Sequence, residues 1–216
     1  MSEALNLVTI TDPLSPISEA YRTLRTNLQF ASLERALHTV LLTCPGAEGR
    51  RAVSATLANL AVSMAQVDQR VILVDSDLRQ PSLHEILGLN NEQGLTTWLG
   101  NEGEMSAPPL QDTPVQGLRL LPSGPLPPRA PDLLSSKRMV QVIDALKGEA
   151  DMVLLAAPPV LDATDAAILA TRVDGVVLVI TGGETRREQA QAAVEQFQRV
   201  KANLLGAVLA NAPVNA

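Results

Sequence analysis

Short apolar runs recur along the chain and are separated by segments of helical pattern. The runs are rich in Val, Leu and Ile, and they cover residues 38–43, 70–75, 152–155, 175–180 and 204–209. The clearest helical patterns cover residues 54–67, 165–171 and 186–201. Continuous apolar runs are typical of strands that are buried on both faces of a parallel sheet. Because strand and helix alternate, we predict an α/β fold with a mostly parallel sheet and helices on both faces.

The first 35 residues read as an N-terminal helical segment. Ser15 is suited to the N-cap, Pro16 to the first turn, and Glu19 lies close to the capping-box position. We expect the helix to run to about Phe30 or Leu33. Its apolar stripe consists of Tyr21, Leu24 and Leu28.

A polar arc lies on the same predicted helix. Glu19, Arg22 and Arg25 are three residues apart and therefore share one side of it. A solvated charged face commonly explains such spacing, and a contact surface for a partner is the other explanation.

Prolines interrupt the segment at residues 108–131. A linker between two domains is one interpretation. Residues 118–124, however, read as a short strand that runs into a turn, so we place the segment inside the domain. With 216 residues, of which 46% are hydrophobic, the chain has the size and apolar content of a single domain spanning residues 1–216.

The charge and the reactive residues exclude several classes of function. The formal net charge is −6, and a nucleic-acid interface is normally basic, so we expect no nucleic-acid partner. Cys44 is the single cysteine and His38 and His84 lie far apart, so no zinc site is expected. Because neither a signal-peptide pattern nor a membrane-spanning apolar run is present, we expect a cytoplasmic domain.

One predicted strand ends in acidic residues. The apolar run at 70–75 closes with Asp75, and Asp77 follows two residues later. In α/β proteins the sites lie at the carboxyl ends of parallel strands. We therefore expect the glycine-containing loop at residues 46–54 to lie at this edge, next to Asp75, Asp77 and Ala156.

Five stretches together resemble the kinase domain of bacterial tyrosine kinases, a family close to the MinD and ParA group of P-loop ATPases. They follow the family's order and cover residues 15–25, 59–66, 71–81, 121–128 and 157–166. Residues 71–81, which read Val-Ile-Leu-Val-Asp-Ser-Asp-Leu-Arg-Gln-Pro, are the most specific. The resemblance implies a P-loop NTPase-like fold, ATP or ADP with Mg²⁺, and phosphorylation of a C-terminal tyrosine cluster in trans within a ring of subunits.

The resemblance also implies partners and a cellular role. The family acts in capsule and exopolysaccharide biosynthesis and export, and a cytoplasmic segment of a membrane co-polymerase activates it. Such a partner would hold the domain at the inner face of the membrane. The ring contacts of the family involve a motif that matches Glu19, Arg22 and Arg25, which implies a homo-oligomer or a mixed ring with related subunits.

The same resemblance assigns the residues of a nucleotide site. Asp75 and Asp77 match the acidic pair that serves Mg²⁺ and the attacking hydroxyl in the family. The candidate metal residues are Asp75 and Ser54. The candidate nucleotide-binding residues are Gly46, Gly49, Arg50, Arg51, Ser54 and Asn211.

The phosphate loop departs from the family pattern, which reads approximately Gly-Pro-Gly-Glu-Gly-Lys-Ser-Thr. One register places Arg50 at the lysine position and Arg51 at the hydroxyl position. The other, counted back from Asn59, places Val53 at the lysine position and keeps Ser54 for the metal. Neither register contains the lysine, and the planar guanidinium of an arginine does not reproduce the geometry of an ammonium.

Two further departures concern the metal and the substrate. The family places an Asp before its Pro-Pro pair, where this chain has Ala156. Tyr21 is the single tyrosine and lies on the apolar stripe of the first predicted helix. We therefore expect no self-phosphorylation of a C-terminal tail, unless a tyrosine cluster lies beyond a truncated end.

These departures favour a degenerate regulatory or scaffolding member of the family with weak or no ATP chemistry. The lysine and the Asp both stabilise the transferring phosphoryl group, so losing both should reduce turnover severely. The alternative is an active ATP-dependent protein-tyrosine kinase or ATPase that uses Arg50 or Arg51. A positioning ATPase of the MinD or ParA type is disfavoured, because it would need an amphipathic tail or a basic surface.

Overall fold

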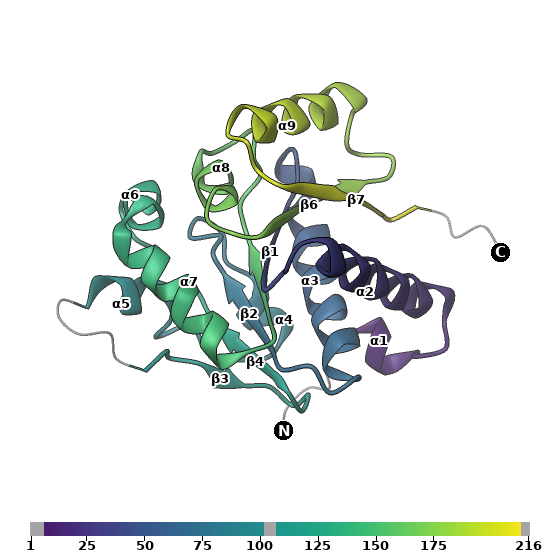
Figure 1. The fold of residues 1–216 in the computed structure, drawn as a ribbon, viewed down its shortest axis with the longest axis horizontal. Coiled ribbons are helices and arrows are strands. Elements are labelled where there is room, and N and C mark those ends of the chain that lie inside the picture. The colour runs from purple at the N-terminus through teal and green to yellow at the C-terminus, as the bar shows by residue number, and fades with distance from the viewer. Residues whose placement is uncertain (1–6, 102–106, 213–216) are drawn as a thin grey trace.

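A seven-stranded sheet forms the centre of the structure, a computed structural model that describes residues 7–101 and 107–212 (Figure 1). The strands are β1 (Thr39–Thr43), β2 (Val71–Asp75), β3 (Gln111–Asp112), β4 (Leu118–Leu121), β5 (Met152–Ala156), β6 (Gly175–Thr181) and β7 (Leu204–Ala210). Their order across the sheet is β3-β4-β2-β5-β1-β6-β7. All neighbouring strands are parallel except β3 and β4, which confirms the predicted mostly parallel sheet.

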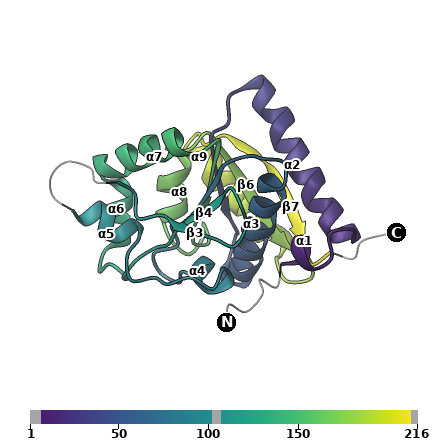
Figure 2. The ribbon, with the colours of Figure 1, turned by 90° about the horizontal axis from the view of Figure 1, so that it is seen from below.

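Helices cover both faces of this sheet, as predicted (Figures 1 and 2). One face packs against α2, α3 and α4, and α1 packs on α2 and α3. The other face packs against α5 to α9. The helices are α1 (Val8–Thr11), α2 (Pro16–Glu34), α3 (Arg50–Ala65), α4 (Leu83–Ile86), α5 (Leu95–Gly100), α6 (Ala130–Ser135), α7 (Lys137–Glu149), α8 (Asp165–Ala170) and α9 (Arg187–Arg199).

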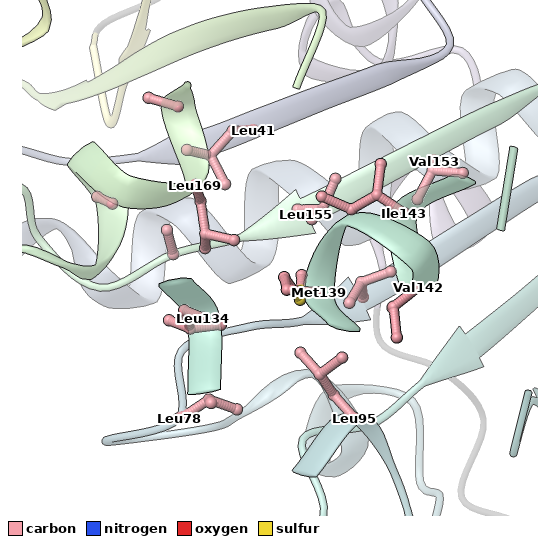
Figure 3. Packing of buried hydrophobic residues seen from close by; sticks show 14 of the residues in the cluster. Leu41, Leu78, Leu95, Leu134, Met139, Val142, Ile143, Val153, Leu155 and Leu169 are labelled. Atoms are coloured by element: carbon pink, nitrogen blue, oxygen red, sulfur yellow. The ribbon is translucent and has the colours of Figure 1, made fainter. Parts of the chain in front are cut away.

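Aliphatic side chains fill the space between the sheet and its helices. Figure 3 shows this packing on the face that carries α7 and α8. Leu41 of β1 and Leu155 of β5 point toward Met139 and Ile143 of α7 and Leu169 of α8. Burying one such side chain contributes roughly 1.5–3 kcal/mol, so the core holds the strand ends in a fixed arrangement.

Helix α2 confirms the helix predicted near the N-terminus. It begins at Pro16, and the Ser15 hydroxyl accepts the backbone N–H of Ser18 at 3.2 Å, as an N-cap does. Leu28 is buried, and Tyr21 and Leu24 pack against the same core. Residues 1–6 of the predicted N-terminal segment lie outside the described residues.

Several helices differ from the sequence prediction. Helix α3 begins at Arg50 rather than at residue 54, because a first turn that starts with two arginines has no apolar periodicity. Helix α7 lies next to the proline-containing segment and was not predicted, although Ser136 caps it by accepting the N–H of Met139. The short helices α1, α4, α5 and α6 were also missed, since four to six residues are too few for a periodic pattern.

None of the helices in the described part of the chain has the length and apolarity that crossing a membrane requires.

Candidate functional site

Three strand ends meet at the carboxyl edge of the sheet. Strand β5 lies between β1 and β2, and its last residue, Ala156, pairs with Leu42 on one side and with Asp75 on the other. The loop after β1 and the acidic residues after β2 are therefore separated by one strand. The side chains of Arg50 and Asp77 bridge this distance, so the loop after β1 and the acidic residues at the end of β2 come together at one edge.

The loop after β1 is short and tightly packed. Residues Ala47–Gly49 form a single 3-10 turn, and Gly49 directly precedes α3. A Cβ on Gly49 would lie 2.5 Å from Cβ of Cys44, so this position requires glycine. The thiol of Cys44 is buried, its Sγ donates to the carbonyl of Gly46 at 3.2 Å, and burial raises its pKa to about 12. Cys44 is thus a protonated core residue.

The start of α3 separates the candidate phosphate contacts. Arg50 and Arg51 occupy the first turn, with Arg51 exposed. Val53 is buried in the core and has no group that binds phosphate. Ser54 is also buried, and its Oγ contacts the carbonyl of Arg50 at 3.3 Å and Oγ of Ser82 at 2.7 Å. Of the two registers, the one that uses Arg50 and Arg51 therefore agrees better with this geometry.

Asp75 is buried at the end of β2, where its carboxylate accepts backbone N–H groups. Oδ2 lies 2.8 Å from N of Ser82 and 2.9 Å from N of Leu83, at the start of α4. Burial raises the pKa of Asp75 to about 7, although these two hydrogen bonds favour the ionised form. The side chain that the resemblance assigned to Mg²⁺ is therefore used to hold the start of a helix.

Asp77 is engaged by the protein on both of its oxygens. Oδ2 forms an ion pair with Nη1 of Arg50, across the gap between the two loops. Oδ1 accepts the backbone N–H groups of Arg79 at 3.2 Å and Gln80 at 3.1 Å. The side chains of Arg50 and Asp77 are only 19% and 10% exposed, so little water competes for this contact.

A second ion pair at the same edge was not predicted from the sequence. Arg79 holds Asp165, at the start of α8, through Nε at 2.9 Å and Nη2 at 3.1 Å. The Asp165 side chain is completely buried, whereas that of Arg79 is 43% exposed. Both residues lie within the stretches that carried the family resemblance, but nothing in the sequence pairs two positions so far apart.

A hollow of about 510 Å³ lies beside the start of α3. Glu48 and Arg51 line it from the loop and first turn, Thr181 from the end of β6, and Asn211 from the residue after β7. Asn211, a candidate nucleotide-binding residue, is thus near the start of α3, although among the described residues no hydrogen bond joins it to Asp75 or Asp77. A ligand in this hollow would meet the N-terminal turn of α3, which has no side-chain cap.

The residues present do not fit the Mg²⁺ that the fold family implies. The carboxylates of Asp75 and Asp77 are engaged by amides and a guanidinium, and Ala156 offers no donor. Among the described residues, no group of three or more His, Cys, Asp or Glu side chains is arranged to hold a metal. A metal would have to displace internal contacts before it could bind.

The predicted interface residues lie on α2. Arg22 pairs with Glu19 at 2.7 Å and donates to the carbonyl of Pro13. Arg25 instead reaches across to α3 and donates to the carbonyl and Oγ of Ser63. Glu19 is 65% exposed and Arg22 31% exposed, so this pair is accessible to a partner.

Comparison with known proteins identifies relatives over nearly the whole chain. Tyrosine-protein kinase YwqD of Bacillus subtilis is 43% identical over 206 residues, which are 94% of this chain and 85% of YwqD. Tyrosine-protein kinase Wzc of Salmonella typhi is 32% identical over 94% of this chain, but the match covers only 28% of Wzc. No protein-family model matches the sequence.

Solved structures agree with these relatives. The chimerical protein CapA2B2 has a TM-score of 0.90 at 30% identity, over 99% of this chain and 93% of its own. The kinase domain of Escherichia coli tyrosine kinase Etk has a TM-score of 0.91 at 26% identity, over 100% and 83%. MinD of Pyrococcus horikoshii, solved with Mg-ADP, shares the fold at 20% identity, with a TM-score of 0.64 over 80% and 69%. The chain therefore has a P-loop NTPase-like fold and belongs to the bacterial tyrosine-protein kinase family.

Proposed function

We propose that this chain is a regulatory or scaffolding domain of the bacterial tyrosine kinase family, with weak or no ATP chemistry, in capsule or exopolysaccharide biosynthesis and export. One observation carries the proposal. Asp75 and Asp77, which match the acidic pair of the family, are bound to groups of the protein itself.

Phosphoryl transfer needs more than a place for the nucleotide. A metal must bridge the β- and γ-phosphates, and the compensating charges must be in position before the bond breaks. Here Ala156 supplies no carboxylate, and Arg50 is held by Asp77. An arginine could replace the lysine as a cation, but no cation replaces a missing carboxylate. Turnover should therefore be lost even if a nucleotide still binds weakly.

The proposal includes partners of the family type. A cytoplasmic segment of a membrane co-polymerase would hold the domain at the inner face of the membrane, and Glu19, Arg22 and Arg25 would contribute to a homo-oligomer or a mixed ring. The accessible pair of Glu19 and Arg22 supports such a contact. A relative such as Wzc, of which the match covers 28%, has ample length outside this domain.

Steady-state ATPase and tyrosine-peptide phosphorylation assays test the loss of chemistry. We expect no turnover above the buffer rate from the unmodified protein with Mg²⁺. Restoring a single residue should change little. The combined variant Arg50→Lys, Arg51→Ser, Ala156→Asp should recover measurable turnover, because it supplies the ammonium, the hydroxyl and the carboxylate together.

The opposite result has a clear signature. Turnover comparable to that of YwqD, abolished in a folded Asp75→Asn variant, would identify an active kinase that uses Arg50 or Arg51. Circular dichroism of the variant excludes simple unfolding, and asparagine retains an oxygen that can accept the N–H groups of Ser82 and Leu83.

A further inference from the structure

Acidic side chains without a partner line the hollow of about 510 Å³ beside the start of α3. Glu48 belongs to the loop after β1 and Glu184 to the loop after β6. Arg51 is the one cation among the described residues that line this hollow. In the part of the chain that the structure describes, no ion pair involves any of these three side chains. The lining therefore has a negative net charge that the described residues do not neutralise.

Two buried oxygen atoms at the same hollow lack a hydrogen-bond partner. They are Oε1 of Glu48 and Oγ1 of Thr181, and neither has a partner among the residues that the structure describes. Thr181 is only 2% exposed. Buried polar side-chain atoms are normally hydrogen-bonded, and an unpaired one costs free energy. Because Thr181 lines the hollow, its unused hydroxyl indicates, independently of the charges, that a ligand group belongs there.

The hollow combines these oxygen atoms with an apolar wall. Glu184 and Asn211 are exposed, whereas Thr181 is buried, so polar groups are present both at the surface and deeper in. Helix α3 contributes the half-buried side chains of Ala52 and Ala55. A ligand that fills the hollow therefore meets acceptors at its polar group and methyl groups along its side.

An organic ammonium group suits this lining better than a metal ion does. An ammonium carries three donors and no acceptor, and carboxylates and a hydroxyl oxygen accept such donors. Methylene groups attached to it would bury apolar surface against the alanines of α3. Calcium and magnesium need six or more oxygen ligands, and no group of three or more His, Cys, Asp or Glu in the described chain is arranged to hold a metal.

The start of α3 acts against a cation, and the lining contains a compensation for it. The first turn of a helix carries the positive end of the helix dipole, which an acidic residue nearby offsets. Glu48 lies two residues before Arg50, the first residue of α3, and provides that charge. Arg51 is exposed, so its guanidinium remains hydrated outside the hollow. Glu184 and the Thr181 hydroxyl are left to hold a ligand.

We propose that this hollow binds a small linear amine of the polyamine class, with one ammonium group held by Glu184, Glu48 and the Thr181 hydroxyl. The methylene chain lies along the alanine wall of α3. A bound amine connects the loop after β1 with the end of β6 and the loop that follows it. The inference goes beyond the proposed function and does not depend on the loss of ATP chemistry.

Isothermal titration calorimetry of the whole chain with putrescine tests this at low ionic strength, where screening is weakest. We expect saturable binding of one putrescine per chain. N,N′-diacetylputrescine has the same methylene chain but no ammonium group, and it should not bind. Equimolar Mg²⁺ should change the putrescine affinity by less than about twofold, because a divalent ion adds only general screening.

Thr181→Val separates a ligand contact from a structural role. The variant keeps the shape of the side chain and removes the hydroxyl, so putrescine should bind about tenfold more weakly, as expected for one hydrogen bond to a charged donor. Urea denaturation without ligand should show no loss of stability, because the hydroxyl makes no hydrogen bond to the described residues. Glu184→Gln removes one charge at the surface and should weaken binding about threefold.

Two further variants control for general charge effects. Glu195→Gln removes the same charge from an exposed pair with Arg199 on α9 and should leave the affinity unchanged. Arg51→Gln removes the cation of the lining and should tighten putrescine binding, whereas the same change would weaken a site for anions.

Four outcomes would overturn the inference. They are no binding of millimolar putrescine by folded protein, unchanged affinity in both Thr181→Val and Glu184→Gln, equal binding of the diacetylated compound, and displacement of putrescine by equimolar Mg²⁺. The last would identify a metal site in place of an amine site. None of these measurements uses turnover, so the kinase assays test the proposed function separately.

Discussion

At the scale of single residues, the site is defined by how two acids are used. Asp75 accepts two backbone N–H groups at the start of α4, and Asp77 pairs with Arg50. Both contacts are internal, so neither carboxylate remains free for a metal. Under the proposed function, this acidic pair keeps the residues of the family motif while their role is structural.

Asp75 gives a pH-dependent contribution to stability. Its pKa is about 7 in the folded state and about 3.9 in an unfolded chain, so the folded state holds a proton that the unfolded state releases between these values. The contribution is fully present below pH 4 and is lost as the pH rises through 7. Urea denaturation should therefore show that the unfolding free energy falls less between pH 5 and pH 8 in Asp75→Asn than in the unmodified protein. The difference between the two falls should be up to a few kcal/mol.

Asp151→Asn is the matched control for this measurement. The Arg70 guanidinium lowers the pKa of Asp151, so its contribution is lost only as the pH falls below the unfolded value. Between pH 5 and 8 its curve should run parallel to that of the unmodified protein. If the Asp75→Asn curve is also parallel, the raised pKa is wrong.

At the scale of helices and strands, side-chain bridges fix the loops that follow the strands. Arg50 connects the start of α3 with the segment after β2, and Arg79 connects that segment with the start of α8. The strand ends themselves are held by the sheet and its core. The two ion pairs also fix the positions of the loops that carry the site.

The pair of Arg79 and Asp165 should matter for stability. In Arg79→Ala the completely buried Asp165 side chain loses its charged partner, which costs about 2 kcal/mol or more in unfolding free energy. The cost stays below that of a fully buried pair because Arg79 is 43% exposed. Urea denaturation measures the change, and Asp165→Asn in the same chain should recover part of it.

Arg70→Ala provides the comparison for that loss. Its pair with Asp151 is 62% and 44% exposed on the two side chains, so removal should cost less than about 1 kcal/mol. Equal losses for Arg79→Ala and Arg70→Ala would show that burial of Asp165 has no particular effect.

At the scale of the whole molecule, the two faces of the sheet are covered and the polar arc of α2 remains at the surface. Arg22 and Glu19 lie there as an accessible pair, while Arg25 is partly engaged with Ser63 of α3. An interface that uses this arc would therefore involve Glu19 and Arg22 directly. Arg25 would act chiefly by fixing α2 on α3.

We expect this surface to mediate self-association. Multi-angle light scattering should find an oligomer for the unmodified protein and a monomer for Arg22→Glu, Arg25→Glu, because the reversed charge at position 22 would repel Glu19 of a neighbouring subunit and the loss of Arg25 would release α2 from Ser63 of α3. Arg186→Glu, Arg187→Glu, which reverses two exposed charges at the start of α9, should leave the oligomer intact. Monomers throughout would contradict an interface on α2.

Much of the fold was predictable because its signals are local. The apolar runs that became β1, β2, β5 and β6 owe their pattern to burial on both faces, and α2 carries its own cap at Ser15. The run that became β7 lies at the edge of the sheet and is partly exposed. Residues 71–81 and the four other stretches that resemble the family placed the chain in it, and the relatives confirm this placement. Short helices escaped prediction, since one or two turns leave no periodic signal.

The sequence by itself determined the layers of this protein, its family and the residues at its carboxyl edge, because each depends on patterns between near neighbours in the chain. Only the tertiary structure decided how those residues are used. Arg50 meets Asp77 and Arg79 meets Asp165 across 27 and 86 positions of the chain. These pairings form because β5 lies between β1 and β2 in the sheet, which sets the distance between the loops that follow β1 and β2. No local sequence pattern encodes that distance.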